Sequence, residues 1–210
     1  MIETDRLLLR PMREDDVEPL LGVFADPAVM AAFGVDPFDR PAMRRWVQRN
    51  LDHQEAHGYG LFAVILKESG LLIGDCGLEL MEIDAAEEGP VVELGYDLRS
   101  DHWNRGLATE AAAAVRDYAF RQLELPRLVS LIRAGNVASR RVAEKIGMRH
   151  EADIQRYDQP YWFYTLNRSQ VAPTNSTTRQ PLGLEEGDCG ARRISNGTLW
   201  AMVSIPGCGG

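Results

Sequence analysis

The chain has 210 residues, of which 45% are hydrophobic and 26% charged, the usual mixture for a globular protein. Its length suits one domain, or one domain followed by a tail. With 31 acidic and 23 basic residues the net charge is −8, which argues against general nucleic-acid binding because such proteins usually present a basic face. The acidic balance mildly favours cationic substrates by long-range attraction.

Targeting and redox signals are sparse. The N-terminal residues lack the basic segment and apolar run of a signal peptide, and no window approaches the roughly 20 apolar residues that span a bilayer. The cysteines Cys76, Cys189 and Cys208 form no spaced disulfide framework. We therefore expect a cytoplasmic protein in a reducing compartment, with no membrane partner.

The first 60 residues predict one strand and two helices. Residues 6–12 form a short apolar strand that either lies at a sheet edge or ends at Pro11. Residues 13–26 have an acidic start and apolar side chains at helical spacing, and residues 40–58 repeat that spacing with a glycine at the end. Residues 27–39, broken by two prolines and a glycine, are expected to be mostly loop.

The middle of the chain alternates strands and helices. Its predicted elements are a hairpin (61–67 and 71–82), a polar loop (83–90), a strand (91–99), a helix (101–115) and a strand (127–134). The last strand, helix and strand in this series predict a parallel crossover at the centre of the sheet.

The last predicted elements are a helix over 136–147 and a hairpin made of 148–154 and 161–167. Asn136 is placed to cap the start of this helix and Gly147 to end it. The whole order of elements predicts an α+β (mixed α/β) domain with a largely antiparallel sheet.

The composition changes after residue 168. Residues 169–210 are rich in Gly, Ser, Thr and Pro, and only "TLWAMVSI" could form a strand. We expect a flexible or loosely docked tail, with an extra strand on the sheet edge as the alternative. The domain itself is expected to cover residues 1–168.

The segment "HWNRGLATEAA", between the central strand and its helix, points to a ligand. A helix N-terminus leaves main-chain N–H groups unpaired and carries partial positive charge, which suits a phosphate. Small residues at Gly106 and Ala108 allow the main chain to approach that ligand closely. A lone glycine in this position also fits an ordinary strand-to-helix connection, so the residues alone leave both interpretations open.

Four segments together resemble the GCN5-related N-acetyltransferase (GNAT) superfamily. "HWNRGLATEAA" is similar to its coenzyme signature, Gln/Arg-x-x-Gly-x-Gly/Ala at a helix start, although Trp103 replaces the Gln or Arg. The segments "IETDRLLLRPMREDD", "ELGYDL" and "NVASRRVAEKIGM" resemble the branch of Rim-type ribosomal-protein N-terminal acetyltransferases. The resemblance covers about residues 1–166 and implies a partly splayed central sheet flanked by about four helices.

The resemblance implies acetyl-coenzyme A as co-substrate and assigns its phosphates to this turn. Main-chain N–H groups of five consecutive residues would hold the pyrophosphate: Arg105, Gly106, Leu107, Ala108 and Thr109. The Arg105 side chain would either add a charged contact or lie in solvent.

The resemblance also assigns the pantetheine arm of the coenzyme. The arm, which is rich in amides, would pair with main-chain groups of Asp97 and Leu98. Asn136 would contact the same arm, and Ser139 would lie near the thioester sulfur. The strands that end near Leu98 and Ile132 should diverge to admit the arm.

Glu93 is the candidate general base. Strand alternation places it on one face with Gly95 and Asp97, and a carboxylate within an apolar central strand is costly unless it serves a function. The alternative is a glutamate that is paired with a buried arginine or lies at the margin of the sheet. Many members of the superfamily carry a tyrosine acid where this chain has Ala143, so Ser139 is the candidate that polarises or protonates the leaving sulfur.

Other polar groups are interpreted more simply. His53 and His57 share one helix face without a third ligand, so we expect exposed histidines and no metal. Cys76 is expected to be buried in a strand. Tyr157 and Asp158 are reserve candidates near the acceptor site, which the first two helices, the polar loop and the closing hairpin would build.

These inferences predict a metal-free N-acetyltransferase that moves an acetyl group from acetyl-coenzyme A to a primary amine by direct attack. The resemblance favours a protein N-terminal α-amine as acceptor, with a small amine such as a polyamine or an aminoglycoside as the alternative. A non-catalytic acyl-coenzyme A sensor on the same fold is a further alternative. The chain is expected to be a monomer or a homodimer, without a nucleic-acid partner.

Overall fold

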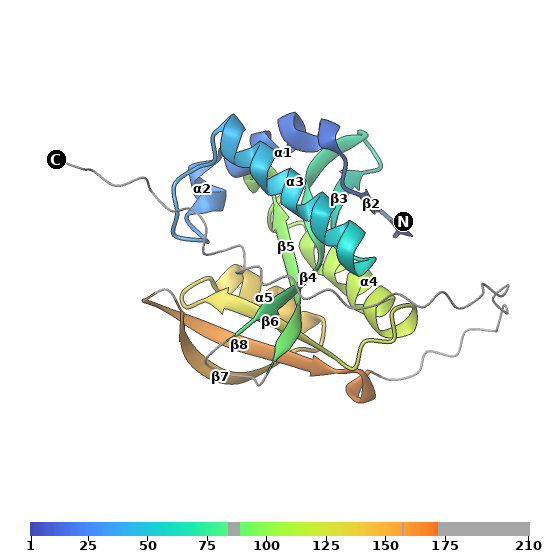
Figure 1. Cartoon of the computed structure of the whole chain (residues 1–210), viewed down its shortest axis with the longest axis vertical. Coiled ribbons are helices and arrows are strands. Elements are labelled where there is room, and N and C mark those ends of the chain that lie inside the picture. Colours follow the sequence, from blue (N-terminus) through green and yellow to red (C-terminus); the bar gives the residue numbers. More distant parts are fainter. Residues whose placement is uncertain (84–88, 157, 172–210) are drawn as a thin grey trace, which may run out of the picture.

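The computed structural model of the chain describes residues 1–83, 89–156 and 158–171. Its strands form one eight-stranded sheet in the order β1-β2-β3-β4-β5-β6-β8-β7, in which β5 and β6 are the parallel neighbours among the described strands (Figure 1). The strands are β1 Ile2–Glu3, β2 Leu7–Pro11, β3 Leu61–Leu66, β4 Leu71–Glu82, β5 Pro90–Leu98, β6 Arg127–Arg133, β7 Arg149–Arg156 and β8 Gln159–Asn167. The helices are α1 Val17–Phe24, α2 Pro27–Met30, α3 Arg40–His57, α4 Leu107–Arg121 and α5 Val137–Lys145, with short 3-10 turns at Glu14–Asp16, Ser100–His102 and Arg168–Gln170.

Helices cover both faces of the sheet, and alternate residues of β3 separate the two cores. Phe62 and Val64 belong to the core that α4 and α5 cover, whereas Leu61 and Ala63 belong to the core that α1, α2 and α3 cover. Cys76 of β4 is buried in the first of these cores, as predicted. The mixed α/β domain with a largely antiparallel sheet is confirmed.

Local signals set three helix ends, two of which were predicted, at Gly58 and Asn136. At the start of α3 the Asp39 carboxylate, which was not a predicted cap, accepts the Ala42 N–H at 2.7 Å, and Gly58 ends that helix in the left-handed conformation with φ 72°. Asn136 caps α5, since its side-chain oxygen accepts the Ser139 N–H at 3.1 Å.

Three elements differ from the predictions. β1 has no predicted counterpart, because a strand of two residues is too short to show a pattern. α4 begins at Leu107 and not near residue 101, because a 3-10 turn and the left-handed Gly106 intervene, and it continues to Arg121. α2 forms one helical turn inside the expected loop, where the Asp26 carboxylate accepts the Ala28 N–H at 2.8 Å.

β5 and β6 diverge soon after they meet. Their register contains one pair, Glu93 and Val129. Beyond it, side chains bond to main-chain groups of the neighbouring strand: Ser130 Oγ donates to the Leu94 carbonyl at 2.6 Å, and Glu93 Oε1 accepts the Leu131 N–H at 3.0 Å. The predicted parallel strands and the splayed sheet are therefore both confirmed.

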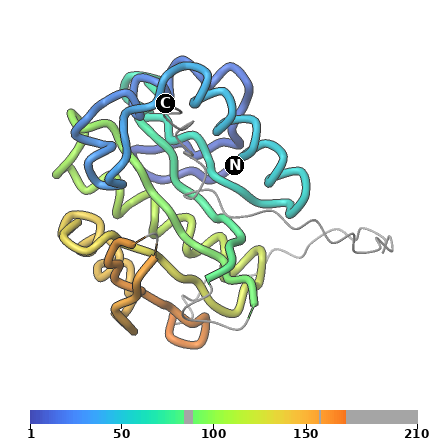
Figure 2. The backbone as a smooth tube through the Cα atoms, turned by 60° about the vertical axis from the view of Figure 1, so that its left-hand side comes forward, coloured from blue at the N-terminus to red at the C-terminus, as the bar shows by residue number. Residues whose placement is uncertain are grey.

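The N-terminal and C-terminal parts of the domain lie on opposite sides of this divergence, as the blue and the orange ends of the tube show (Figure 2). A third core cluster, which includes Val129 and Phe163, packs the sheet on the C-terminal side. No helix in the described ranges combines the length and apolarity needed to cross a membrane. Residues 84–88 of the expected polar loop, and the expected tail beyond residue 171, lie outside the described residues.

Candidate active site

The connection between β5 and α4 is a tight turn that leaves the start of α4 bare. Gly106 precedes the helix with φ 77°, and Asn104 shares the left-handed region with φ 58°. Glycine and asparagine adopt this conformation with the least strain. The Trp103 indole N–H donates to the Leu98 carbonyl at 2.7 Å and thereby ties the turn to the end of β5.

The first main-chain N–H groups of this helix are available to a ligand. Those of Gly106, Leu107, Ala108 and Thr109 have no hydrogen-bond acceptor within the described part of the chain, and the first helical bond runs from the Glu110 N–H to the Gly106 carbonyl at 3.0 Å. Unpaired N–H groups and the helix dipole together make this end positive. The start of α4 can therefore bind an anionic group.

A groove opens between the end of β5, the start of α4 and the start of α5. We call it the splay groove, and its lining includes Leu98, Trp103, Gly106, Leu107, Ala108, Thr109, Asn136, Ser139, Arg141 and Lys145. Arg141 and Lys145 lie one turn apart on α5 and add positive charge to the groove. Neither was a candidate from the sequence, because basic residues on a helix surface are usually solvated.

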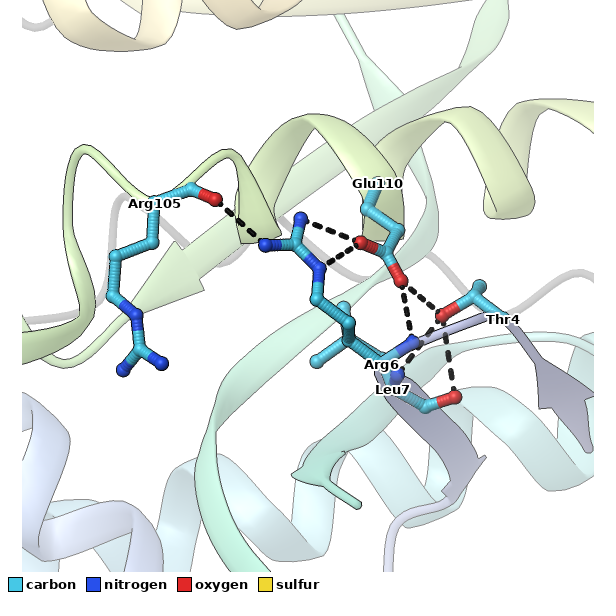
Figure 3. A network of polar contacts seen from close by, with 5 residues as sticks. All are labelled: Thr4, Arg6, Leu7, Arg105 and Glu110. Atoms are coloured by element: carbon cyan, nitrogen blue, oxygen red, sulfur yellow. Dashed lines mark hydrogen bonds and ion pairs between the residues drawn. The ribbon is translucent and has the colours of Figure 1, made fainter. Parts of the chain in front are cut away.

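The splay groove collects all but one of the predicted coenzyme-binding residues. They are Asp97, Leu98, Gly106, Leu107, Ala108, Thr109 and Asn136. Arg105 is exposed and lies outside this lining. Its carbonyl oxygen accepts a hydrogen bond from Arg6 at 2.9 Å, and its side chain extends away from that contact (Figure 3). Of the two alternatives for the Arg105 side chain, the structure therefore shows the solvent-exposed one, while Arg141 and Lys145 line the groove.

The main chain of Asp97 does not face the splay groove, contrary to expectation. The Arg99 N–H donates to the Ile73 carbonyl of β4 at 2.8 Å, so the main-chain groups of Arg99 and Asp97 face β4. By alternation, the main-chain groups of Tyr96 and Leu98 face the other way, toward the divergence of β5 and β6. The main chain that can meet an extended ligand there belongs to Tyr96 and Leu98.

A second cavity adjoins the splay groove along β5, and we call it the sheet pocket. Its lining includes Ala32, Phe33, Val35, Glu93, Gly95, Leu131, Arg133, Arg156 and Tyr161, from the segment after α2, the two central strands and the closing hairpin. Six residues line both cavities, namely Ala32, Tyr96, Asp97, Arg133, Asn136 and Ser139. The two cavities are therefore adjacent where β5 and β6 part.

Glu93 is buried in the sheet pocket, with 6% of the residue exposed. Burial raises the pKa of its carboxyl to about 8, although the hydrogen bond from the Leu131 N–H opposes the rise. Arg156, which lines the same pocket, also opposes it. A carboxyl that changes protonation near neutral pH and lines a pocket is suited to general-base catalysis.

Three further carboxyls lie on the same face of the sheet: those of Asp97, Asp75 and Glu79, the last directly opposite Glu93. Asp97 and Asp75 are opposite each other in the β5–β4 ladder. Asp75 is fully buried, and neither of its oxygens has a hydrogen-bond partner in the described chain. Burial raises the pKa of Asp97 to about 7 and that of Asp75 well above its usual range. Between Glu93 and Asp97, Gly95 has open space where a Cβ atom would stand, so the pocket floor is acidic and unobstructed.

Ser139 and Asn136 lie where the two cavities join. The Tyr96 hydroxyl donates to the Ser139 carbonyl at 2.7 Å, and burial raises the pKa of that hydroxyl above its usual range. Sequence reasoning missed Tyr96, because alternation places it opposite Glu93 and only the divergence of the strands opens both faces of β5. Ala143, at the position of the missing tyrosine acid, is buried in the core.

The remaining candidates lie elsewhere. His53 is half-buried, contrary to expectation: its Nε2 accepts the Leu80 N–H at 3.4 Å, and burial lowers its pKa to about 4, with the neighbouring His57 contributing. No cluster of three or more potential metal ligands occurs in the described ranges. Asp158 occupies the hairpin turn with φ 57°, and Tyr157 lies outside the described residues.

Known proteins share this architecture. The profile of the acetyltransferase (GNAT) domain matches residues 6–149. Bacillus subtilis YkkB is 37% identical over 163 residues, which cover 77% of this chain and 92% of YkkB. The crystal structure of an acetyltransferase from Agrobacterium tumefaciens is 33% identical with a TM-score of 0.68, and covers 79% of this chain and 93% of that one. RimL, a ribosomal L7/L12 α-N-protein acetyltransferase in complex with coenzyme A, shares the fold at 18% identity with a TM-score of 0.66. The match covers 78% of this chain and 95% of the RimL chain.

The split mixed sheet and the match to the acetyltransferase (GNAT) domain profile together identify the class of the protein as an acetyl-coenzyme A-dependent N-acetyltransferase. The chain belongs to the GNAT acetyltransferase family, whose domain profile spans more than half of its length. Members of this family use acetyl-coenzyme A and act on amines, so the predicted enzyme class is confirmed.

Proposed function

We propose that the splay groove holds acetyl-coenzyme A and that the sheet pocket holds the amine that receives the acetyl group. The observation that carries this proposal is that the two cavities lie side by side and share six lining residues. The N–H groups of residues 106–109 bind the pyrophosphate, with Arg141 and Lys145 adding charge. The arm then passes Asn136 and brings the thioester to Ser139.

Direct attack needs a neutral amine, a stabilised oxyanion and a proton for the leaving thiolate. Glu93 takes the amine proton, directly or through water, because its carboxyl lines the pocket and exchanges a proton near pH 8. Main-chain N–H groups at the divergence of β5 and β6 stabilise the oxyanion. As the C–N bond forms and the C–S bond breaks, the Ser139 hydroxyl donates a hydrogen bond to the leaving thiolate, which then takes its proton from water. The Tyr96 hydroxyl holds Ser139 in place through the Ser139 main-chain carbonyl.

The preferred acceptor is the α-amine of a protein N-terminus. RimL, which shares the fold, is named for acetylating such an amine on L7/L12. The pKa of an α-amine, roughly 7.7–8.0, is close to that of Glu93, so proton transfer between them costs little near neutral pH. A lysine amine, with a pKa of roughly 10.4, is matched less well.

A small polycationic amine is the second candidate acceptor. The pocket floor carries the Asp97 carboxyl, and behind it Asp75 has two oxygens without a partner among the described residues. A second ammonium group on the acceptor would offset the cost of burying this pair. An uncharged peptide side chain in the same place would not offset this cost.

A thiol-release assay with acetyl-coenzyme A tests both acceptors. The panel contains N-terminal peptides, the same peptides already acetylated at the α-amine but carrying lysine, and polyamines. Release only with free α-amines supports the first acceptor, and release only with polyamines supports the second. Coenzyme binding without release on any amine would identify a non-catalytic sensor instead.

A further inference from the structure

We propose that Arg6, which lies outside both cavities, is a positioning residue that aims the N–H groups of the β5–α4 turn at the coenzyme phosphates. The inference rests on the proposed function, because it assumes that the pyrophosphate binds at residues 106–109. Arg6 directly precedes β2 and is separated from Arg105 by 99 positions in the sequence. Nevertheless its guanidinium lies between α4 and the carbonyl of Arg105 (Figure 3).

One carboxylate attaches the N-terminal segment to α4. Glu110 Oε1 accepts hydrogen bonds from Thr4 Oγ1 at 2.6 Å and from the Arg6 main-chain N–H at 2.9 Å. Glu110 Oε2 accepts the Arg6 Nε–H at 2.7 Å and pairs with Arg6 Nη2 at 2.6 Å. This two-point ion pair fixes the plane of the guanidinium. Its third nitrogen, Nη1, then donates to the Arg105 carbonyl at 2.9 Å.

The bonded carbonyl controls a neighbouring donor. The Arg105 oxygen belongs to the peptide unit that carries the Gly106 N–H, and in a planar trans peptide these two groups point in opposite directions. A bond that holds the oxygen toward Arg6 therefore turns the Gly106 N–H away from Arg6, toward the splay groove that Gly106 lines.

This peptide unit needs an external restraint. It joins Arg105 to Gly106, whose φ is 77°, and it follows Asn104, whose φ is 58°; glycine by itself resists rotation very little. The guanidinium also lies close to the turn, since Arg6 Nη2 is 3.6 Å from the position that a Cβ atom on Gly106 would take. Finally, Arg6 neutralises Glu110, whose negative charge would otherwise stand in the first turn of the helix and repel a phosphate.

The test is calorimetric titration of folded Arg6→Met and Arg6→Lys proteins with coenzyme A and with pantetheine, which lacks the phosphates. We expect Arg6→Met to bind coenzyme A about tenfold more weakly, the loss typical of one charge-assisted hydrogen bond, and to bind pantetheine like the wild type. Arg6→Lys is expected to lose most of the same affinity, because an ammonium cannot hold Glu110 at two points and also reach Arg105.

Thr4→Val is the matched control, because it removes a donor to Glu110 and leaves the contact of Arg6 with Arg105 in place. It is expected to lower the melting temperature without weakening coenzyme A binding. Unchanged coenzyme A affinity in folded Arg6 variants overturns the proposal, as does an equal loss in Thr4→Val. If pantetheine binds too weakly to titrate, the comparison of coenzyme A affinity between the Arg6 variants and Thr4→Val decides whether the proposal holds. A wild-type protein that binds no coenzyme A overturns the proposed function itself.

Discussion

At the scale of single residues, the proposed role of Glu93 as general base predicts how the rate depends on pH. Burial holds this pKa at about 8, so the carboxyl is mostly protonated at pH 7 and gains the ability to accept a proton as the pH rises. We expect Glu93→Gln to lower kcat/KM by about 100-fold or more at pH 8. The ratio of wild-type to variant rates, which cancels the titration of the amine, should rise up to about pH 8 and then level off. Initial rates of thiol release from pH 6 to pH 10 measure it.

The same shift affects stability. The usual pKa of the carboxyl is 4.5 and the folded value is about 8, so between these values the folded protein keeps a proton that the unfolded chain has lost. The free energy of unfolding therefore falls as the pH rises through this window. The amide of the Glu93→Gln variant carries no charge at any of these pH values, so this variant should be more stable than wild type at pH 8.5 and similar at pH 5 in urea unfolding. A variant less stable at pH 8.5 contradicts this account of burial.

At the scale of elements, the bare middle of β5 determines how much room the acceptor has. Gly95 has open space around a Cβ position and an ordinary strand conformation, so Gly95→Val should fold normally while filling the sheet pocket. We expect at least about tenfold lower kcat/KM for the amine, from the steric clash, with unchanged coenzyme A affinity. In contrast, Gly77→Ala should destabilise the fold, because its Cβ would lie 2.3 Å from the Gly60 oxygen. Normal amine kinetics in Gly95→Val would remove the sheet pocket as the acceptor site.

The sequence predicts those elements and site residues whose signals are local. Caps such as Asn136 mark helix ends, a small residue such as Gly106 marks the bare turn, and Glu93 stands out as a carboxylate in an apolar strand. The sequence does not predict residues that reach the site only because separate segments of the chain pack together. Tyr96 reaches the site because two strands diverge, and Arg6 reaches the turn because β2 lies beside α4. Which of several surface cations faces a groove likewise follows from helix packing.

At the scale of the whole molecule, we propose that residues 1–171 form the complete folding unit. Val171 packs against the core that α4 covers, so the unit extends slightly beyond the expected boundary at residue 168. A chain that ends after Val171 should keep its melting temperature within about 2 °C, which corresponds to roughly 0.5 kcal/mol for a domain of this size. Circular-dichroism melts of the full and shortened chains measure this. Loss of cooperative unfolding would show that residues 172–210 are needed for the fold.

A split in the middle of a sheet creates two additional strand edges, and exposed edges promote aggregation by recruiting strands from other chains. In this protein two side chains of the central strands occupy main-chain groups of these edges. The Ser130 hydroxyl donates to the Leu94 carbonyl, and the Glu93 carboxyl accepts the Leu131 N–H. The flanking helices α4 and α5 narrow the access that remains. A thin, amide-rich ligand can enter such an opening, whereas a full strand with side chains on both faces cannot. By occupying main-chain groups at these edges, the Ser130 hydroxyl and the Glu93 carboxyl therefore help to protect the molecule against self-association.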